Sequence, residues 1–404
     1  MHPSTTALHP QLSQRITAQY ETKTPISNSR SSSAPSRNAG RPRSQPDPRT
    51  NPRSLPPTMK AIKIQKYTPT PSTLVPIVTS KPSASVYAPI SVRITHCSPQ
   101  HADILHAQGT HQNNNEKRGW CHPPFNLGYD FAGVVADVCP DAVEGDDHGL
   151  KKGDRVFGAR IGAFADYISV RAATVRKVPN GVSSEAACAL AGQVVSYAAV
   201  VHVARVKEGE TVLVSGASGG LGSACCAVAK AAGARVVALT GDEGKAELMR
   251  RDMGIDVAVM DEERYWIDEV KGLTEGRGVD VVLDNTGMVN RAIQCLAYEC
   301  RIIVLGFAAR KGKMEGVKMK RLLLKSVTVT GYRFGKSGRK SPEKLEDIWK
   351  GFLGIMERGE LKPILYGSYK GLEEIGRALG DLEARKVYGK IVVKISDDEK
   401  KPKL

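Results

Sequence analysis

A glycine-rich turn at residues 216–222 constrains the fold of this chain more than any other feature of its sequence. It reads Gly-Ala-Ser-Gly-Gly-Leu-Gly and directly follows a short apolar run, Thr211–Ser215. A helical stretch of about a dozen residues comes next, ends near Gly233 and leads into a second apolar run, Arg235–Leu239. This spacing predicts a βαβ unit, although Ala217 replaces the first glycine of the strict GxGxxG pattern.

Such a turn is suited to hold a pyrophosphate. Small residues let the backbone approach the phosphates closely, and the helix N-terminus directs free N–H groups and the positive end of its dipole toward them. The sequence therefore predicts a dinucleotide site, whose turn residues are Ser218, Gly219, Gly220, Leu221 and Gly222.

The end of the second strand indicates which dinucleotide binds. A carboxylate there would bind the ribose 2′-hydroxyl and repel a 2′-phosphate. Here the strand ends at Thr240, and Lys245 lies one turn further on, where it can pair with a phosphate. We therefore expect NADP(H). Asp242 lies 20 residues beyond Gly222, where counting alone would place the acid, but two extra residues carry it into the loop. A solvated Lys245 without a ligand is the alternative.

The pattern of strands and helices divides the chain after residue 58 into three parts. Residues 183–330 alternate continuous apolar strands with helices, which is typical of a parallel sheet covered on both faces. Residues 59–182 contain short strands and turns, and residues 331–404 a helical stretch and a last strand at Lys390–Ile395. We predict an α/β fold: a central Rossmann-type, doubly wound parallel sheet with a mostly β substrate domain built from residues 59–182 and 331–404.

Residues 1–58 have the composition of a disordered extension. They hold ten prolines, ten serines and eight Lys/Arg against two acids, without a periodic apolar pattern. A mitochondrial transit peptide and a functional start at Met59 are alternatives. Pro3 and Pro10 weigh against a targeting helix, so we expect a cytoplasmic protein. The C-terminal Pro402-Lys403-Leu404 only loosely resembles a peroxisomal signal.

Cysteine usage and hydropathy narrow the class of protein further. None of the eight cysteines falls in a CxxC pair, so we expect free thiols in a reducing compartment. No apolar run is long enough for a membrane-spanning helix, so we expect no membrane partner.

From Met59 onward, the chain resembles the medium-chain dehydrogenase/reductases, in their zinc-free quinone oxidoreductase branch. The segments that carry the resemblance occur in family order, at residues 59–61, 103–105, 108–109, 128–135, 153–156, 216–222, 229–234, 284–287, 361–363 and 389–390. The resemblance implies a GroES-like substrate domain, a dinucleotide domain, a homodimer, and hydride transfer from NADPH to a small electrophilic substrate, a quinone or an α,β-unsaturated carbonyl.

The resemblance also bears on metal binding. Zinc-dependent members take one ligand from the histidine of a Gly-His-Glu segment, and here that segment reads Gly128-Tyr129-Asp130. A four-cysteine lobe for structural zinc is missing as well. We therefore predict no metal.

Three side chains are candidates for contact with the substrate. Gln100 stands where the family has an asparagine, and His111 where it has a tyrosine. Gln100 can donate a hydrogen bond, and His111 can give a proton, although a surface histidine is the commoner fate. By resemblance, Tyr129 faces the cofactor cleft. Asp103 is expected to be a structural hydrogen-bond acceptor, and an insertion at Asn113–Arg118 reshapes the rim.

Further cofactor contacts follow from the resemblance alone. It places Val195 beside the nicotinamide and the turns at Asn285 and Phe307 along the same cleft, and it adds Lys390 to the cofactor-binding residues. For Val195 and Phe307, core packing is the alternative.

A basic strip accounts for most of the positive charge outside residues 1–58. Residues 308–340 contain eleven Lys/Arg and one acid, Glu315. A solvated surface is one interpretation. An anionic acyl thioester, reduced by an enoyl-thioester reductase, is another. Binding of nucleic acid is disfavoured because no interleaved aromatic residues accompany the charge. Gln100 and His111 differ from the family residues at these positions. A third interpretation is therefore an NADPH-binding sensor, or an RNA-binding protein, with weak catalytic activity.

Overall fold

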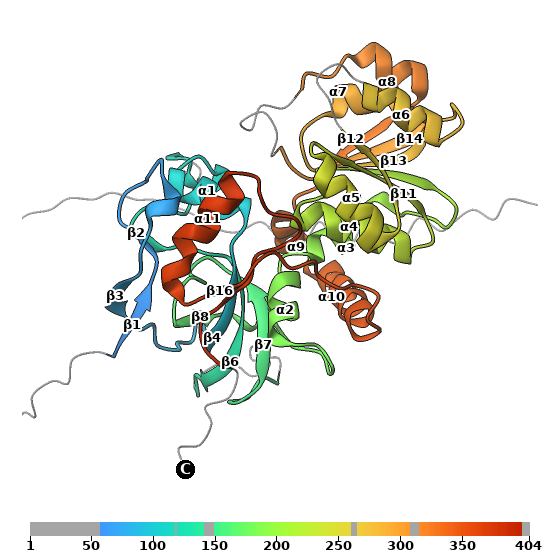
Figure 1. Ribbon diagram of the computed structural model, residues 1–404. Coiled ribbons are helices and arrows are strands. Elements are labelled where there is room, and N and C mark those ends of the chain that lie inside the picture. Colours follow the sequence, from blue (N-terminus) through green and yellow to red (C-terminus); the bar gives the residue numbers. More distant parts are fainter. Residues whose placement is uncertain (1–56, 118, 141–148, 260–264, 308–314, 398–404) are drawn as a thin grey trace, which may run out of the picture. The chain divides into compact units, whose positions relative to one another are not determined.

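The computed structural model in Figure 1 describes residues 57–117, 119–140, 149–259, 265–307 and 315–397. Except for its last two residues, the extension predicted at residues 1–58 lies outside the described residues, and so does the C-terminal Pro402-Lys403-Leu404.

A six-stranded parallel sheet forms the dinucleotide-binding part, as predicted. Its strands are β10 (Thr211–Ser215), β11 (Arg235–Thr240), β12 (Asp256–Val259), β13 (Val279–Asp284), β14 (Leu296–Val304) and β15 (Thr328–Gly331). They lie in the order β12-β11-β10-β13-β14-β15, which is the 3-2-1-4-5-6 order of doubly wound dinucleotide folds. Between β10 and β13 the chain reverses direction across the sheet, and such a switch point is where ligands bind in these folds.

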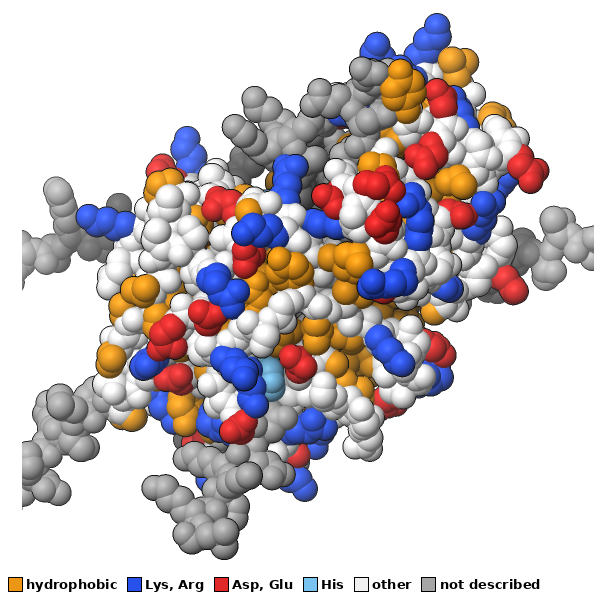
Figure 2. All heavy atoms as spheres, viewed as in Figure 1, with side chains coloured by type: hydrophobic (Ala, Val, Ile, Leu, Met, Phe, Trp, Pro, Cys, Tyr) orange, Lys and Arg blue, Asp and Glu red, His pale blue; other side chains and the backbone are white. Residues whose placement is uncertain are grey.

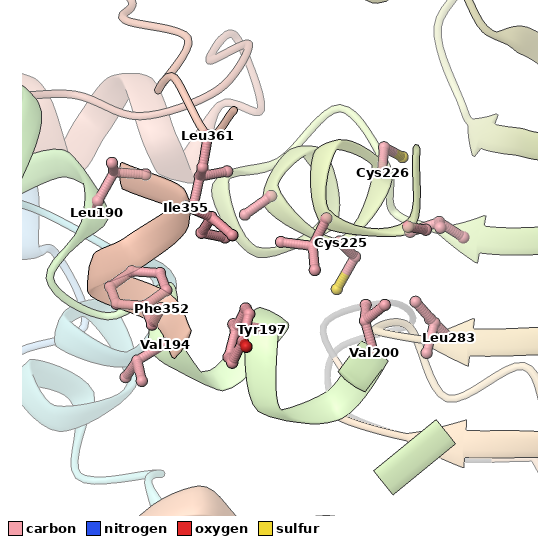
Figure 3. Close-up of a cluster of buried hydrophobic side chains, with 14 of the residues drawn as sticks. Leu190, Val194, Tyr197, Val200, Cys225, Cys226, Leu283, Phe352, Ile355 and Leu361 are labelled. Carbon is pink, nitrogen blue, oxygen red and sulfur yellow. The ribbon is translucent and has the colours of Figure 1, made fainter. Parts of the chain in front are cut away.

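Alternate residues of these strands belong to two separate cores. Val212 and Val214 pack on one face with α4 (Gly220–Ala231) and α10 (Pro342–Glu357), while Leu213 packs on the other with Trp266 of α6 (Tyr265–Leu273). Because both faces are covered, both alternating sets of side chains must be apolar. Figure 3 shows the first core, with Phe352 and Ile355 of α10 beside Tyr197 and Cys225.

The substrate part is a mostly antiparallel sheet made from both ends of the chain, as predicted. Its strands are β4 (Ile90–Ser98), β6 (Asp130–Val138), β7 (Arg155–Ala159), β8 (Tyr167–Val170), β9 (Val175–Lys177), β16 (Tyr369–Lys370) and β17 (Val393–Lys394). The C-terminal β17 pairs with β4, with Val393 opposite Cys97, so the chain returns to its first domain. Small sheets pair β1 (Thr58–Ala61) with β3 (Ile77–Ser80), and β2 (Lys63–Ile64) with β5 (Phe125–Asn126).

Short helices complete the two parts. They are α1 (His101–Gln108), α2 (Ser184–Leu190), α3 (Val194–Tyr197), α5 (Glu243–Met253), α7 (Val289–Ala292), α8 (Met319–Lys325), α9 (Phe334–Lys340) and α11 (Ile375–Glu383). Within the described ranges, no single helix is long and apolar enough to cross a membrane. Only the bent pair Ser184–Leu190 and Val194–Ala204 has the required length and apolar composition when its two helices are taken together.

The structure differs from the sequence-based expectations in three places. Strand β14 begins at Leu296, five residues before the predicted strand at Arg301. The predicted last strand, Lys390–Ile395, is reduced to Val393–Lys394, because Lys390 instead makes a single bridge to Leu365. The domain boundary predicted at residue 330 falls inside β15, and the side chains of α10 join the core of the parallel sheet.

All eight cysteines are free thiols, as predicted. Seven are buried, and burial raises the pKa of these thiols, for example to about 12 for Cys225. They therefore behave as small apolar core residues with little thiolate character.

Candidate active site

The glycine turn joins β10 to the N-terminus of α4 and leaves space beside one of its glycines. A Cβ atom at Gly222 would lie 2.3 Å from the carbonyl oxygen of Gly216, and one at Gly220 would lie 2.4 Å from Cδ of Lys390. At Gly219, by contrast, a Cβ atom would meet a single described atom, 3.6 Å away. The first N–H groups of a helix have no partner inside it. The residues present therefore fit a pyrophosphate placed next to Gly219.

Ser218 is held from two sides of the turn. Its carbonyl accepts a hydrogen bond from Gly389 N at 2.9 Å, and its Oγ accepts one from the hydroxyl of Thr240 at 3.1 Å. Leu221 is fixed as well, because its carbonyl accepts from Ser196 Oγ. These contacts preorganise the turn in the absence of a ligand.

The end of β11 presents a hydroxyl where a carboxylate would select the unphosphorylated dinucleotide. Thr240 is the last residue of the strand and is buried. Asp242 lies beyond it and caps α5, because its Oδ1 accepts from Lys245 N at 2.8 Å. The predicted exclusion of Asp242 from the strand end is confirmed, and its carboxylate has a local structural role.

Lys245 lies in the first turn of α5, but its amine already has a partner. Nζ donates to the carbonyl oxygen of Arg385, and burial lowers the pKa of this lysine. A phosphate at the end of β11 would therefore compete with that carbonyl for the ammonium.

Lys390 forms a buried ion pair at the base of the glycine turn. Its Nζ lies 2.9 Å from Oδ2 of Asp130, and both side chains are buried. The methylene groups of Lys390 lie against Gly220, while Gln100 Nε2 donates to Asp130 Oδ1 at 3.3 Å. The predicted site residues Gln100 and Lys390 thus meet at Asp130, and the ammonium of Lys390 is directed to that carboxylate.

Asp103 has the structural role that we expected. Its Oδ2 accepts from the backbone N–H of Gln100 at 2.9 Å, at the start of α1. Burial raises the pKa of this carboxyl well above its usual range. The contact fixes the backbone of Gln100, so that its side chain can reach Asp130.

Tyr129 and His111 belong to one aromatic cluster whose centre is His106. The Tyr129 hydroxyl lies 3.1 Å from Nε2 of His106, and the rings of His106 and His111 stack with centroids 4.0 Å apart. The backbone N–H of Asn113 donates to His111 Nδ1 at 3.2 Å. We did not predict His106: nothing in the sequence distinguishes it from a core residue of α1.

The two stacked histidines are neutral at ordinary pH. Burial lowers the pKa of His106 to about 3, while burial and the nearby Arg333 lower the pKa of His111 to about 4. In Tyr129, burial raises the pKa of the phenol above its usual value. The cluster therefore presents a protonated hydroxyl beside an uncharged imidazole.

This neutrality predicts a pH dependence of stability. An unfolded histidine titrates near about 6.5, so below that pH the unfolded chain binds protons that the folded chain excludes. The free energy of unfolding should decrease as the pH falls from about 6.5 toward 4, and His111→Asn, which keeps a capping acceptor, should reduce that slope. Urea unfolding at several pH values measures it. Equal slopes in H111N and the unmodified chain would show that His111 does not titrate as described.

Comparison with known proteins identifies the two parts of the chain. Residues 88–180 match the model of the alcohol dehydrogenase GroES-like domain, and residues 220–350 match that of the zinc-binding dehydrogenase. Quinone oxidoreductase-like protein 2 of Mus musculus is 31% identical over 314 residues, which are 76% of this chain and 85% of the mouse protein. The chain belongs to the medium-chain dehydrogenase/reductases, in their quinone oxidoreductase-like branch.

Two further comparisons show the range of similar proteins. A mycobacterial protein solved in complex with NADPH is 26% identical, with a TM-score of 0.73 over 83% of this chain and 99% of that one. Squalestatin tetraketide synthase clz2 of Cochliobolus lunatus is 28% identical over 281 residues; these are 68% of this chain and 11% of the synthase.

The remaining predicted residues of this dehydrogenase/reductase chain lie on three different elements. Val195 is half-buried in α3, and Phe307 follows β14 with 41% of its surface exposed. Asn285 follows β13, where its Nδ2 donates to the carbonyl of Ser215 at 2.8 Å while its Oδ1 is buried without a partner. Asp284 fixes this turn by accepting from the N–H groups of Thr286, Gly287 and Met288.

Family members differ in whether they carry a donor set for a metal. Among the described residues, no three His, Cys, Asp or Glu side chains come together in a group that could hold a metal ion. Tyr129, at the segment where zinc-dependent members carry histidine, points to His106 through its hydroxyl.

Part of the basic strip, residues 308–314, lies outside the described residues. In the described part, Arg321 Nη1 donates to the carbonyl of Asn290 at 2.9 Å, and Lys325 Nζ donates to that of Leu296. Lys318 and Lys320 are exposed. Elsewhere, on the face drawn in Figure 2, Lys and Arg side chains are interspersed with Asp and Glu.

Proposed function

We propose that this chain binds NADPH and reduces a quinone or an α,β-unsaturated carbonyl. The observation that carries the proposal is the glycine turn, with space beside Gly219 and a hydroxyl, not a carboxylate, at the end of β11. The similar mycobacterial protein in complex with NADPH supports the choice of cofactor. Seven of the eight cysteines are buried free thiols, and burial raises the pKa of each of these seven, so they supply little thiolate.

In this proposal the protein orients the substrate and stabilises negative charge. Bound NADPH would supply a hydride to the electrophilic carbon, and charge would then develop on the carbonyl oxygen. The Tyr129 hydroxyl, whose raised pKa keeps it protonated, is suited to donate a hydrogen bond to that oxygen. Gln100, at the start of α1, donates a hydrogen bond to Asp130, the residue that follows Tyr129.

A substrate panel tests the proposal. The purified chain is given NADPH with quinones, enones and enoyl thioesters, and loss of the reduced nicotinamide is followed. Turnover of a quinone or an enone is expected. Tight binding of NADPH without turnover of any member would contradict the proposal and favour the sensor alternative.

Lys245 should contribute to cofactor selection. If its ammonium leaves the Arg385 carbonyl for the 2′-phosphate, Lys245→Ala will raise the Kd for NADPH about tenfold, equal to about 1.4 kcal/mol. The Kd for NADH should stay within about twofold, which excludes general damage to the site. Titration of both cofactors by fluorescence measures this. Equal weakening of NADPH and NADH would assign Lys245 a purely structural role.

An enoyl-thioester substrate is the second candidate, favoured by the similarity to part of a tetraketide synthase and by the exposed Lys318 and Lys320. A phosphate-bearing thioester would be attracted to these cations. Lys318→Ala with Lys320→Ala should then raise KM for enoyl thioesters and leave KM for a small enone unchanged. Arg321 is less suitable for this test, because it also binds the Asn290 carbonyl.

We also propose a homodimer formed through the edge of the parallel sheet. Strand β15 is the last strand of that sheet, and Val329 on it is exposed. Leu323 and Leu324 of the preceding α8 are 78% and 65% exposed. A second copy paired along β15 would cover this edge and these side chains. Light scattering should give twice the chain mass, and Leu323→Glu with Leu324→Glu should give the monomer. A monomeric unmodified chain would contradict the dimer.

A further inference from the structure

We infer that His106 positions the Tyr129 hydroxyl for the reduction, by donating to the phenol oxygen through Nε2 and leaving the hydroxyl hydrogen free for the substrate. The inference rests on the proposed function. It concerns a residue that we did not predict from the sequence.

The geometry supplies the first argument. Nε2 of His106 lies 3.1 Å from the Tyr129 oxygen, within hydrogen-bond distance, and the ring centroids are 5.3 Å apart. His106 is fully buried in α1, whereas Tyr129 is partly exposed just before β6. The partner of the hydroxyl is therefore on a helix, and the tyrosine residue itself is partly exposed.

Ring packing holds His106 in place. His111 stacks on it at 4.0 Å with an interplanar angle of 29°, and Phe125 meets it edge-on at 6.2 Å. With three aromatic neighbours, the imidazole has little freedom to rotate, so the direction of its Nε2 is fixed.

The charge state supplies the second argument. The low pKa of both histidines keeps their rings neutral, so one nitrogen of His106 carries a proton. If the tyrosine donated its only hydrogen to His106, no hydrogen would remain for the substrate oxygen. With the proton on Nε2, the imidazole donates and the hydroxyl hydrogen can face the substrate.

The charged and titratable groups around the cluster fit this arrangement. A hydrogen bond from the Asn113 side chain and the charge of Arg160 lower the pKa of Tyr129, while Asp103 of α1 and Cys121 raise it. Arg333 lowers the pKa of His111, and a hydrogen bond with Asn114 raises that of His106. Burial outweighs these charges, and the phenol stays protonated. Tyr129 is therefore suited to a fixed hydrogen bond to the developing oxyanion, and solvent water supplies the proton that completes the reduction.

A double-mutant cycle tests the inference in the full chain, with the best quinone or enone of the panel. His106→Leu is expected to lower kcat about tenfold, with KM and the Kd for NADPH within about twofold. His106→Gln, which can still donate, should restore most of kcat. In the Tyr129→Phe background, H106L should have no further effect on kcat.

The pH profile of kcat should stay flat between about pH 5 and 9 in the unmodified chain, because both histidines and the phenol titrate outside that range.

Two results would overturn the inference: an equal loss of kcat for H106L with and without Y129F, or no loss at all. A cofactor-binding chain that turns over no substrate would instead contradict the proposed function.

For that case, nitrogen NMR of histidine-labelled protein gives a readout independent of activity. We expect His106 to carry its proton on Nε2 and its resonance to shift in Y129F. A proton on Nδ1, or no shift, would overturn the inference. Thermal unfolding of each variant, with H106Q as the conservative one, separates misfolding from loss of positioning.

Discussion

Gly219→Asp should raise the Kd for NADPH at least about 100-fold, equal to about 2.7 kcal/mol, without destabilising the fold. Gly219 precedes α4 with φ −83°, a conformation open to any residue, and its Cβ would have space. Aspartate is a favourable residue at a helix N-cap, so the helix should tolerate it. Its carboxylate would nevertheless occupy the space for the pyrophosphate and repel it. Titration with NADPH and thermal unfolding measure the two effects separately.

Two other glycines provide matched controls. Gly272→Asp adds the same charge at an exposed position of α6, where a Cβ meets no described atom, and should leave NADPH affinity unchanged. Gly222→Ala should lower the melting temperature, because its Cβ would lie 2.3 Å from the Gly216 carbonyl oxygen. Unchanged NADPH affinity in G219D would mean that the pyrophosphate does not bind at this turn.

Lys390→Met should destabilise the fold by about 3–5 kcal/mol, the usual cost of removing one member of a buried ion pair. Methionine keeps the side chain that packs against Gly220 but leaves the carboxylate of Asp130 buried without its ammonium. Asp130 also accepts a hydrogen bond from Gln100, so the substitution should also destabilise the start of α1. Urea unfolding with and without NADPH gives the change in stability.

A substitution of Asp130, the partner of Lys390, tests whether the unpaired buried charge causes the loss of stability. Asp130→Asn combined with Lys390→Met removes both charges and keeps an acceptor for Gln100, so most of the lost stability should return. A double variant as unstable as K390M would contradict this explanation and point to lost packing of the lysine stem.

The dinucleotide-binding sheet was the most predictable part of the structure. Its strands are buried on both faces, so Thr211–Ser215 reads as a continuous apolar run with a sharp end at the glycine turn. Such local signals predicted both bounds of β10 correctly and those of α4 to within about three residues. The position of Asp242 outside the strand end followed from the same argument, whereas its capping of α5 was seen only in the structure.

The contacts across the site could not be read from sequence. Asp130 and Lys390 are 260 residues apart, and only the return of the C-terminal chain to β4 brings them together. The resemblance assigned Lys390 to the cofactor, whereas its ammonium lies on Asp130. Nothing in the sequence singled out His106, because a histidine on a short helix resembles a core residue until its spatial neighbours are known.

The comparison of NADPH with NADH in steady-state turnover tests the central claim most directly. The full chain, treated with a chelator, is assayed with one quinone or enone and either cofactor. We predict a kcat/KM at least about tenfold higher for NADPH and no loss of activity with the chelator. In the proposed site, Thr240 and Lys245 would select the cofactor, and side-chain hydrogen bonds would stabilise the developing charge. A preference for NADH, or activity that disappears with the chelator, would contradict this account.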